Sequence, residues 1–328
     1  MTIRTMTATI LALVAAFCAA CAQPRTAVTA APEDPIHLLR NHSINPKSPL
    51  TFRVKMAPAP VLDYLRKLDQ APEYQNYLVR KSDMGQIATY LNLMPAKMRA
   101  VLQERLIGIY FINNFKGSGL TEWVRDERNS FYAFMVFNPD TLARDLSSWL
   151  TYRERSCFIA NDPDISIEVD CGKKHTGFLY VLLHEAAHVA DYAQGITPYV
   201  EDSLKSISPA RGARTPFVEG AWNGIRTPAS PFDFPLRASL TFYGFGGGPK
   251  IPIARAIDAY RMLEKTPFVS LYGATSWAED LADYAFFMHL TGALKQPYAI
   301  TVRKKGSEPY IIRPAETARK TLNRPYPL

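Results

Sequence analysis

The sequence predicts an α+β fold, in which a small mixed sheet and a histidine-bearing helix are followed by a mostly helical C-terminal half. Three observations lead to this prediction. Residues 131–137 (FYAFMVF) have the aromatic and apolar character of a strand. Residues 177–195 are apolar around most of a helical circumference, as in a helix that crosses a core. Residues 253–265 read as a further helix, residues 268–290 contain another that begins at Ser276, and the 328-residue chain, 47% hydrophobic, has ample material for a core.

The first 21 residues are expected to form a secretory leader. Arg4 is followed by an apolar run at residues 10–17, which is too short to remain as a membrane-spanning helix, and then by small residues. The sequence CAAC at residues 18–21 resembles a bacterial lipobox, so Cys21 is expected to be acylated. A simple cut after Ala22 is the alternative. Either reading predicts export to the periplasm or outer membrane.

Residues 22–50 are predicted to be a flexible tether, because they are rich in Ala, Pro, Thr and Asn and contain few large apolar side chains. His37 and His42 are expected to be solvated there. The remaining residues, 51–328, are expected to form one domain. Its N-terminal half ends near residue 195, and its C-terminal half is 196–328.

The formal net charge is +8, and only Arg4 of these cations lies in the leader. A basic surface is compatible with an anionic envelope or with acidic polymers. Nucleic acid is not an expected partner, because the cations are scattered and the densest group is only Arg303-Lys304-Lys305.

Cys157 and Cys171 are the two cysteines outside the leader. An exported chain reaches an oxidising compartment, so a disulfide between them is expected. A metal or nucleophilic role is less favoured, because neither cysteine belongs to a CxxC pair.

The other elements follow from apolar spacing and from breaker residues. We expect helices at 61–68, 84–93, from Pro95 to about Phe115, and at 140–151, strands at 121–125, 131–137 and 165–169, and a C-terminal hairpin of 298–302 with 310–312. Residues 196–249 are rich in Pro, Gly and aromatic residues, so they are expected to wall a cleft. An insertion with only a packing role is the alternative.

The helix at 177–195 carries polar side chains that need partners. Tyr180, His184, His188 and Asp191 are spaced by four, four and three residues, so they form one stripe. Buried imidazoles without partners would each cost kilocalories. A metal ion bound by the stripe would offset that cost.

His184-Glu185-Ala186-Ala187-His188 is an HExxH motif. Two imidazoles one turn apart can bind one Zn²⁺ ion, and Glu185 can accept a proton from water beside it. The alternative is a pair of hydrogen-bonded core histidines with a chance glutamate between them. With six histidines in the whole chain, the zinc reading is favoured.

A catalytic zinc site needs a third protein ligand. The candidates are Glu201, Glu219, Glu264, Glu279, His289 and Asp191. A metzincin is excluded, because Asp191 and Gln194 stand where that class has Gly and His. Glu279 is the best candidate, since Asp283 lies one turn later and could orient a ligating histidine. On spacing alone, a capping box of Ser276 and Glu279 explains the segment equally well.

The longer segment 268–283 (FVSLYGATSWAEDLAD) decides between these readings. It resembles the lethal-factor-like and Pro-Pro-endopeptidase-like metallopeptidases, in which a tyrosine precedes the ligand glutamate by seven residues. The resemblance implies that Glu279 is the third ligand and that Tyr272 stabilises the oxyanion. Asp283 stands where the family has Glu, and Gly273 where it has Ala.

The resemblance further implies a zincin-like fold of gluzincin type, in which a strand at the sheet edge pairs with the substrate backbone. Either 131–137 or 165–169 is the expected strand. The implied function is a zinc-dependent endopeptidase of the bacterial cell envelope, with one Zn²⁺, a peptide or protein substrate and a lipid anchor in the membrane. The alternatives are a catalytically silent scaffold lipoprotein and a zinc hydrolase of a cell-wall polymer. Asp191, on the same stripe, is expected beside the ligands.

Overall fold

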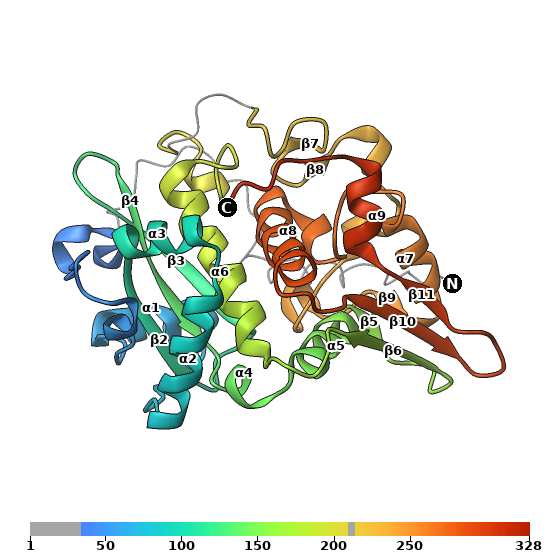
Figure 1. Cartoon of the computed structure of the whole chain (residues 1–328), viewed down its shortest axis with the longest axis horizontal. Helices are drawn as coiled ribbons and strands as arrows, with labels where there is room; N and C mark the ends of the chain where they lie inside the picture. The colour runs from blue at the N-terminus through green and yellow to red at the C-terminus, as the bar shows by residue number, and fades with distance from the viewer. Residues whose placement is uncertain (1–33, 209–213) are drawn as a thin grey trace, which may run out of the picture.

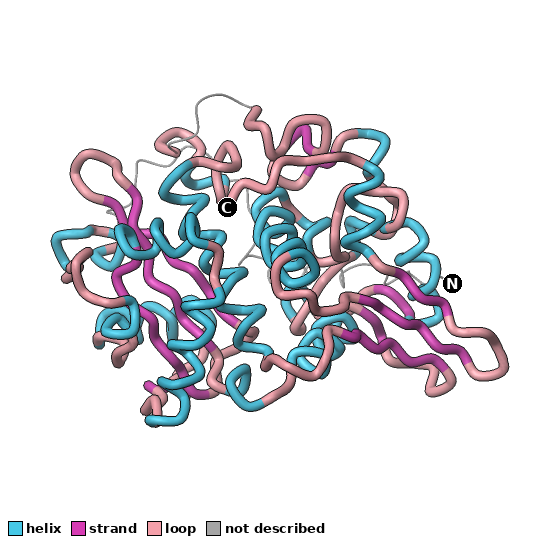
Figure 2. The backbone as a smooth tube through the Cα atoms, in the orientation of Figure 1, coloured by secondary structure: helices cyan, strands magenta, loops and turns pink. Residues whose placement is uncertain are grey.

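The long buried helix α6 (Gly177–Gln194) lies between the two halves of the molecule (Figure 1). The computed structural model describes residues 34–208 and 214–328. On one side of α6 lies a four-stranded sheet with helices around it, and on the other lie most of the later helices and a three-stranded sheet. Figure 2 shows this mixture of helices, small sheets and long loops. The α+β prediction is confirmed.

The other elements have the following bounds. The helices are α1 (Ala59–Asp69), α2 (Lys81–Leu93), α3 (Ala96–Arg105), α4 (Asp140–Ala143), α5 (Leu146–Ser156), α7 (Ala256–Leu263), α8 (Trp277–Gly292) and α9 (Pro314–Thr321). The strands are β1 (Gln75–Asn76), β2 (Leu106–Asn113), β3 (Gly119–Arg125), β4 (Phe131–Phe137), β5 (Phe158–Ile159), β6 (Ile165–Asp170), β7 (Trp222–Gly224), β8 (Thr227–Pro228), β9 (Ile251–Pro252), β10 (Ala299–Lys304) and β11 (Tyr310–Ile312).

The four-stranded sheet has the order β1-β2-β4-β3. β2 and β4 are parallel, whereas β3 is antiparallel to β4. The expected helix from Pro95 to Phe115 is wrong in its second half, because α3 ends at Arg105 and β2 begins at once. The run LIGIYFI is buried on both faces of the sheet, and a continuous apolar run of this kind fits a central strand as well as a helix.

The expected helix at 140–151 is two helices with a break between them. Arg144 ends α4 in an extended conformation, and Asp145 begins α5 by accepting a hydrogen bond of 2.9 Å from the Ser148 N–H. An aspartate suits this position because its carboxylate satisfies a free N–H of the first turn. The predicted C-terminal hairpin is present, and its strand β10 also pairs with β6.

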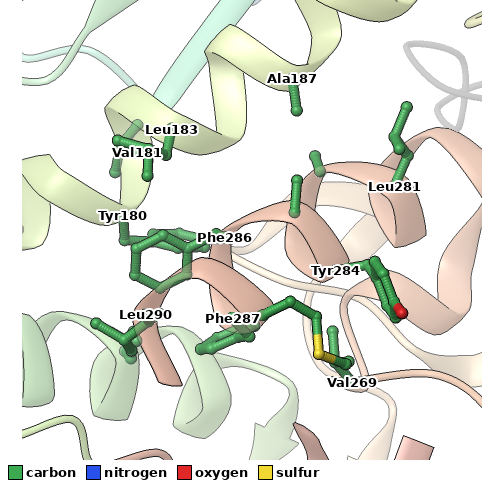
Figure 3. Packing of buried hydrophobic residues seen from close by; sticks show 14 of the residues in the cluster. Tyr180, Val181, Leu183, Ala187, Val269, Leu281, Tyr284, Phe286, Phe287 and Leu290 are labelled. Atoms are coloured by element: carbon green, nitrogen blue, oxygen red, sulfur yellow. The ribbon is translucent and has the colours of Figure 1, made fainter. Parts of the chain in front are cut away.

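The main core lies where α6 meets α8. Figure 3 shows Tyr180 of α6 beside Phe286 of α8, and their ring centroids lie 5.0 Å apart. Both side chains are at most 3% exposed. Gly195 ends α6 with φ of 64°, a left-handed conformation that glycine adopts without strain, and its N–H donates to the Asp191 carbonyl at 2.7 Å.

The prediction of a flexible tether is wrong for residues 34–50. Ile36 and Leu50 are buried, and two 3₁₀ turns, Pro35–His37 and Leu39–Asn41, pack against the fold. Burial of the few apolar side chains offsets the loss of chain entropy. The rest of the expected tether, Cys21 and the leader lie outside the described residues. Within the described residues, no helix is long and apolar enough to cross a membrane.

The predicted disulfide is also wrong. Cys157 ends α5 and Cys171 follows β6, and both thiols are free and fully buried. Burial raises the pKa of Cys157 to about 12 and raises that of Cys171 as well. A neutral thiol packs as a small apolar group, so these cysteines contribute to the core without a covalent link.

Candidate metal centre

Helices α6 and α8 lie side by side and bring three metal-binding side chains to one point (Figure 1). Nε2 of His184 lies 3.1 Å from Oε2 of Glu279 and 3.3 Å from Nε2 of His188. Nε2 of His188 lies 3.7 Å from the same Glu279 oxygen. The two histidines and the glutamate predicted from the sequence therefore converge.

The spacing of these three atoms fits a tetrahedral cation site. Bonds of roughly 2.0–2.1 Å at tetrahedral angles separate neighbouring ligand atoms by about 3.3–3.4 Å. The observed separations of 3.1, 3.3 and 3.7 Å lie on both sides of that value. Two imidazoles and one carboxylate are also the donor set that a zinc-sized cation accepts. The residues present fit such an ion.

One side of the cluster is more open than the other. The side chains of His184 and His188 are 6% and 10% exposed, whereas that of Glu279 is 27% exposed. A catalytic metal site keeps one position for water or substrate. The Glu279 side is where that position would meet solvent.

Asp283 contacts Nδ1 of His184, the ring nitrogen that does not face Glu279. Its Oδ1 lies 3.0 Å from Nδ1 of His184 and accepts a hydrogen bond of 2.9 Å from the Tyr180 hydroxyl. Its Oδ2 accepts from Arg153 at 2.9 Å and from the hydroxyl of Ser270. A proton on Nδ1 leaves Nε2 free to bind a cation, so this contact selects the useful tautomer.

The ionisable groups around the cluster stabilise one another in their charged forms. Burial lowers the pKa of His184, but hydrogen bonds to Asp283 and Glu279 outweigh it and raise that pKa to about 10. Burial would raise the pKa of Glu279, but hydrogen bonds from the two histidines hold it well below its usual range. Burial would likewise raise the pKa of Asp283, yet the Arg153 charge lowers it. Both carboxylates are ionised in the protein.

Glu185 lies between the cluster and strand β3. The hydroxyl of Thr121 donates to its Oε2 at 2.7 Å and lies 3.0 Å from its backbone oxygen. Gly119 leaves room for it, because a Cβ on that glycine would lie 2.9 Å from Glu185 Oε1. Burial raises the pKa of Glu185, which makes its carboxylate a better proton acceptor near neutral pH.

Tyr272 lies beside the cluster, just before the turn that leads into α8. Its ring centroid is 5.7 Å from that of His184 and 5.1 Å from that of Phe242. Tyr243 also contacts it, with centroids 6.4 Å apart. Residues of the long loop 196–249 therefore pack against this tyrosine.

Ser276 and Glu279 combine two roles that the sequence left as alternatives. The Ser276 hydroxyl accepts a hydrogen bond of 3.2 Å from the Glu279 N–H and so begins α8. The Glu279 carboxylate points to the histidines instead of turning back to the cap. The backbone of Glu279 belongs to the cap and its side chain to the metal cluster.

The remaining candidate ligands lie elsewhere. Glu219 is exposed, Glu264 accepts from the Tyr310 hydroxyl, and His289 Nε2 lies 2.8 Å from the Leu93 carbonyl. Glu201 lies near the hydroxyl of Tyr192. None of these side chains reaches the cluster.

Asp191, which was expected beside the ligands, has its carboxylate directed to the loop that follows α6. Its two carboxylate oxygens accept 2.6 Å hydrogen bonds from the N–H and the hydroxyl of Thr197. It therefore fixes the loop that follows α6. Nδ1 of His188 is buried and has no hydrogen-bond partner among the described residues.

Neither of the two strands that were expected to pair with a substrate offers a free backbone edge. β4 is central in its sheet, between β2 and β3. The outer edge of β6 is used by α5, since Thr151 and Ser147 accept hydrogen bonds from the backbone N–H groups of Val169 and Cys171. The edge strand beside Glu185 is β3. Glu122 and Arg125 make β3 charged whereas β4 has no charged residue, and this difference is the sequence signal that could have marked β3 as the edge strand.

Sequence reasoning missed the residues that support the cluster from a distance. Thr121 and Arg153 carry no motif, and only the folded chain brings them to Glu185 and Asp283. Tyr180 was placed on the histidine stripe without a partner, and Ser270 lies within the segment that resembles the metallopeptidases. The stripe and the segment are therefore the sequence signals that could have identified Tyr180 and Ser270.

Comparisons with known proteins found no relative. No protein-family model, curated protein or solved structure matches the chain. The function of the site is therefore inferred from the chemistry and the geometry of its own residues.

Proposed function

We propose that the chain is a zinc-dependent endopeptidase of gluzincin type with a zincin-like arrangement, acting in the bacterial cell envelope. The observation that carries the proposal is the triangle of His184, His188 and Glu279 donor atoms, 3.1 to 3.7 Å apart, beside the carboxylate of Glu185.

A bound Zn²⁺ would act as a Lewis acid that polarises the scissile carbonyl and lowers the pKa of water. His184, His188 and Glu279 would hold the ion, and Asp283 would keep His184 in the required tautomer. Glu185 would accept a proton as the oxygen of water bonds to the carbonyl carbon. As the C–N bond breaks, Glu185 would pass that proton to the leaving amine.

Tyr272 and strand β3 would position the substrate. Burial raises the pKa of Tyr272 well above its ordinary value, so its hydroxyl keeps its proton and can donate a hydrogen bond to the developing oxyanion. The backbone of β3 beside Glu185 would pair with an extended peptide, as in β-strand addition. The loop residues Phe242 and Tyr243 would hold Tyr272 in place.

The test is to purify the protein, measure bound zinc, and follow cleavage of a peptide library by wild type and by Glu185→Gln. We expect one zinc per chain in both proteins. Removal of a general base costs roughly 10²–10⁴-fold in rate, so cleavage should fall by that factor in the variant.

Three outcomes would contradict the proposal. Bound zinc without cleavage by either protein would indicate a binding or scaffold role. Release of fragments from cell-wall material, but not from peptides, would indicate a hydrolase of that polymer. A chain that binds no zinc would remove the basis of the proposal.

A further inference from the structure

The backbone groups of β3 divide into two sets. Asn138 donates to the Ser118 carbonyl at 3.0 Å, and Asp126 donates to the Ser130 carbonyl at 3.1 Å. In an antiparallel pair, residues alternate between bonding to the partner strand and facing away from it. The even-numbered residues of β3 therefore bond to β4, and the odd-numbered ones direct their N–H and C=O groups to the outer edge.

The first half of this outer edge runs beside the catalytic cluster. Gly119 lies against Glu185, and the side chain of Thr121 bonds to it. A peptide paired with the backbone of these two residues would lie alongside the general base. We call residues 119–121 the open edge.

The second half of the edge is covered by the chain's own N-terminal segment. Leu38 forms a parallel bridge with Arg125, and Nδ1 of His37 donates to the Trp123 carbonyl at 2.9 Å. The His37 ring stacks on the Trp123 ring, with centroids 4.0 Å apart and planes 16° apart. An extended peptide that follows the open edge toward Arg125 would meet this segment.

The covering segment is fixed to the fold. Ile36 is 3% exposed and belongs to an apolar cluster with residues of α1, β2 and β4. On the other side, the His42 ring lies against the Phe134 ring of β4, with centroids 6.1 Å apart, and its Nε2 lies 2.7 Å from the Ile36 carbonyl. The segment is therefore anchored on both sides of the point where it covers β3.

The other end of the edge leads into a cavity. Just before Gly119, the Ser118 hydroxyl donates to the Tyr243 hydroxyl at 2.9 Å. Tyr243 lines a cavity of about 790 Å³ together with Gly117, Trp149, Tyr152 and Phe245. Phe245 and Tyr152 are 45% and 47% exposed, so aromatic surface is open to a ligand there.

We propose that the substrate groove is open at the Gly117 end and closed at the Trp123 end, so that a peptide substrate extends along β3 on one side of the scissile bond only. On the open side, further residues of the peptide reach the aromatic cavity. On the closed side, the peptide ends or turns away before His37 and Leu38. This inference rests on the proposed endopeptidase function and gives it a substrate class: peptides that end or turn away from β3 a few residues from the scissile bond on one side.

The test uses a cleaved peptide that is lengthened step by step from its N-terminus or from its C-terminus. For wild type, kcat/KM should stay constant as the peptides of one series are lengthened. In the other series it should fall once the extension exceeds a few residues. Two main-chain hydrogen bonds lost at the blocked end correspond to roughly a tenfold decrease. Equal tolerance of both extensions would overturn the inference.

The full-length double variant Ile36→Ser/His37→Ala should release the segment and remove the difference between the two series. His37→Ala alone is the milder variant, used if the double variant loses its folded state. Arg40→Ala, an exposed change on the same segment, is the matched control and should keep the wild-type asymmetry. A double variant that folds, binds zinc and still shows the full asymmetry would also overturn the inference.

A second readout separates this inference from the proposed function. Labelled peptides of both series are titrated into the zinc-loaded Glu185→Gln protein, and their Kd values are measured by fluorescence anisotropy. Length-dependent binding without turnover by wild type would contradict the endopeptidase but support the one-ended groove. Equal Kd values for both series would overturn the groove, whether or not wild type cleaves.

Discussion

Gly119 controls where the Glu185 carboxylate lies. A Cβ at this position would lie 2.6 Å from Cγ1 of Val181 and 2.9 Å from Oε1 of Glu185. Both neighbours belong to the buried helix α6, which has little freedom to move. The missing side chain of one glycine is thus a condition for the position of the Glu185 carboxylate, the proposed general base.

We therefore expect Gly119→Ala to lower kcat/KM by roughly 10²-fold, because a displacement of about 1 Å of a catalytic group has an effect of that size. Overpacking should also cost about 1–3 kcal/mol of stability. Gly85→Ala is the matched control, since nothing lies within 4 Å of its Cβ position in α2. Bound zinc should stay at one per chain in both variants, and full activity in Gly119→Ala would contradict this account.

Arg153 supports the cluster from a fully buried position. It donates to Glu154 at 2.8 Å and to Asp283 at 2.9 Å, and none of the three side chains is exposed. Its guanidinium also lies 5.0 Å from the ring centroid of Tyr180 and 5.5 Å from that of Tyr272. One cation balances two buried carboxylates.

Arg153→Met should lower the free energy of unfolding by about 3–5 kcal/mol, because it leaves buried carboxylates without a cation. Arg303→Met is the control: Arg303 pairs with Glu168 at 3.4 Å on the surface, and such pairs contribute about 0–1 kcal/mol. Urea unfolding of the two variants measures the difference. Similar losses in both would show that the buried network adds nothing to stability.

At the scale of the elements, α6 and α8 were predictable because each carries its own signals: apolar residues around the helix, a terminal glycine in α6 and a serine cap in α8. β2 was not, since an apolar strand buried on both faces has no periodicity to separate it from the end of α3. The charges of Glu122 and Arg125 favoured an edge position for β3, but they could not give the order of the strands. Strand order is a property of the assembled sheet and not of any one segment.

The contact between α6 and α8 should also depend on pH in the metal-free protein. The pKa of His184 is about 10 in the folded state, against 6.5 for an ordinary histidine. A folded pKa above the unfolded one gives stability that is fully present below pH 6.5 and is lost as pH rises through 10. The free energy of unfolding of the zinc-free protein should therefore fall between pH 7 and pH 10.

His184→Gln is the control for this prediction, because it removes the titrating group and should flatten the pH profile in that interval. The measurement is urea unfolding after treatment with a chelator, at several pH values. If the free energy of unfolding of wild type rises from pH 7 to pH 10, the effect has the opposite sign and the charges assigned to the cluster are contradicted.

At the scale of the whole molecule, the three clustered side chains come from helices that belong to different halves of the chain. The HExxH motif pointed to His184 and His188, and the resemblance of residues 268–283 pointed to Glu279. The sequence did not reveal the support around them, since Thr121, Arg153 and the segment at His37 are brought in by long-range packing. A metal held by both α6 and α8 would therefore link the two halves.

Removal of the metal should lower the stability of the entire domain. With free zinc at about a thousand times Kd, binding to the folded state alone contributes about 4 kcal/mol, which for a domain of this size is roughly 10 °C in Tm. A chelator should lower the Tm of wild type by that amount, and added zinc should restore it. Glu279→Gln should respond much less, because the charged third ligand is lost. A wild-type Tm that is the same with zinc and with chelator would show that the three side chains do not bind the ion in the folded protein.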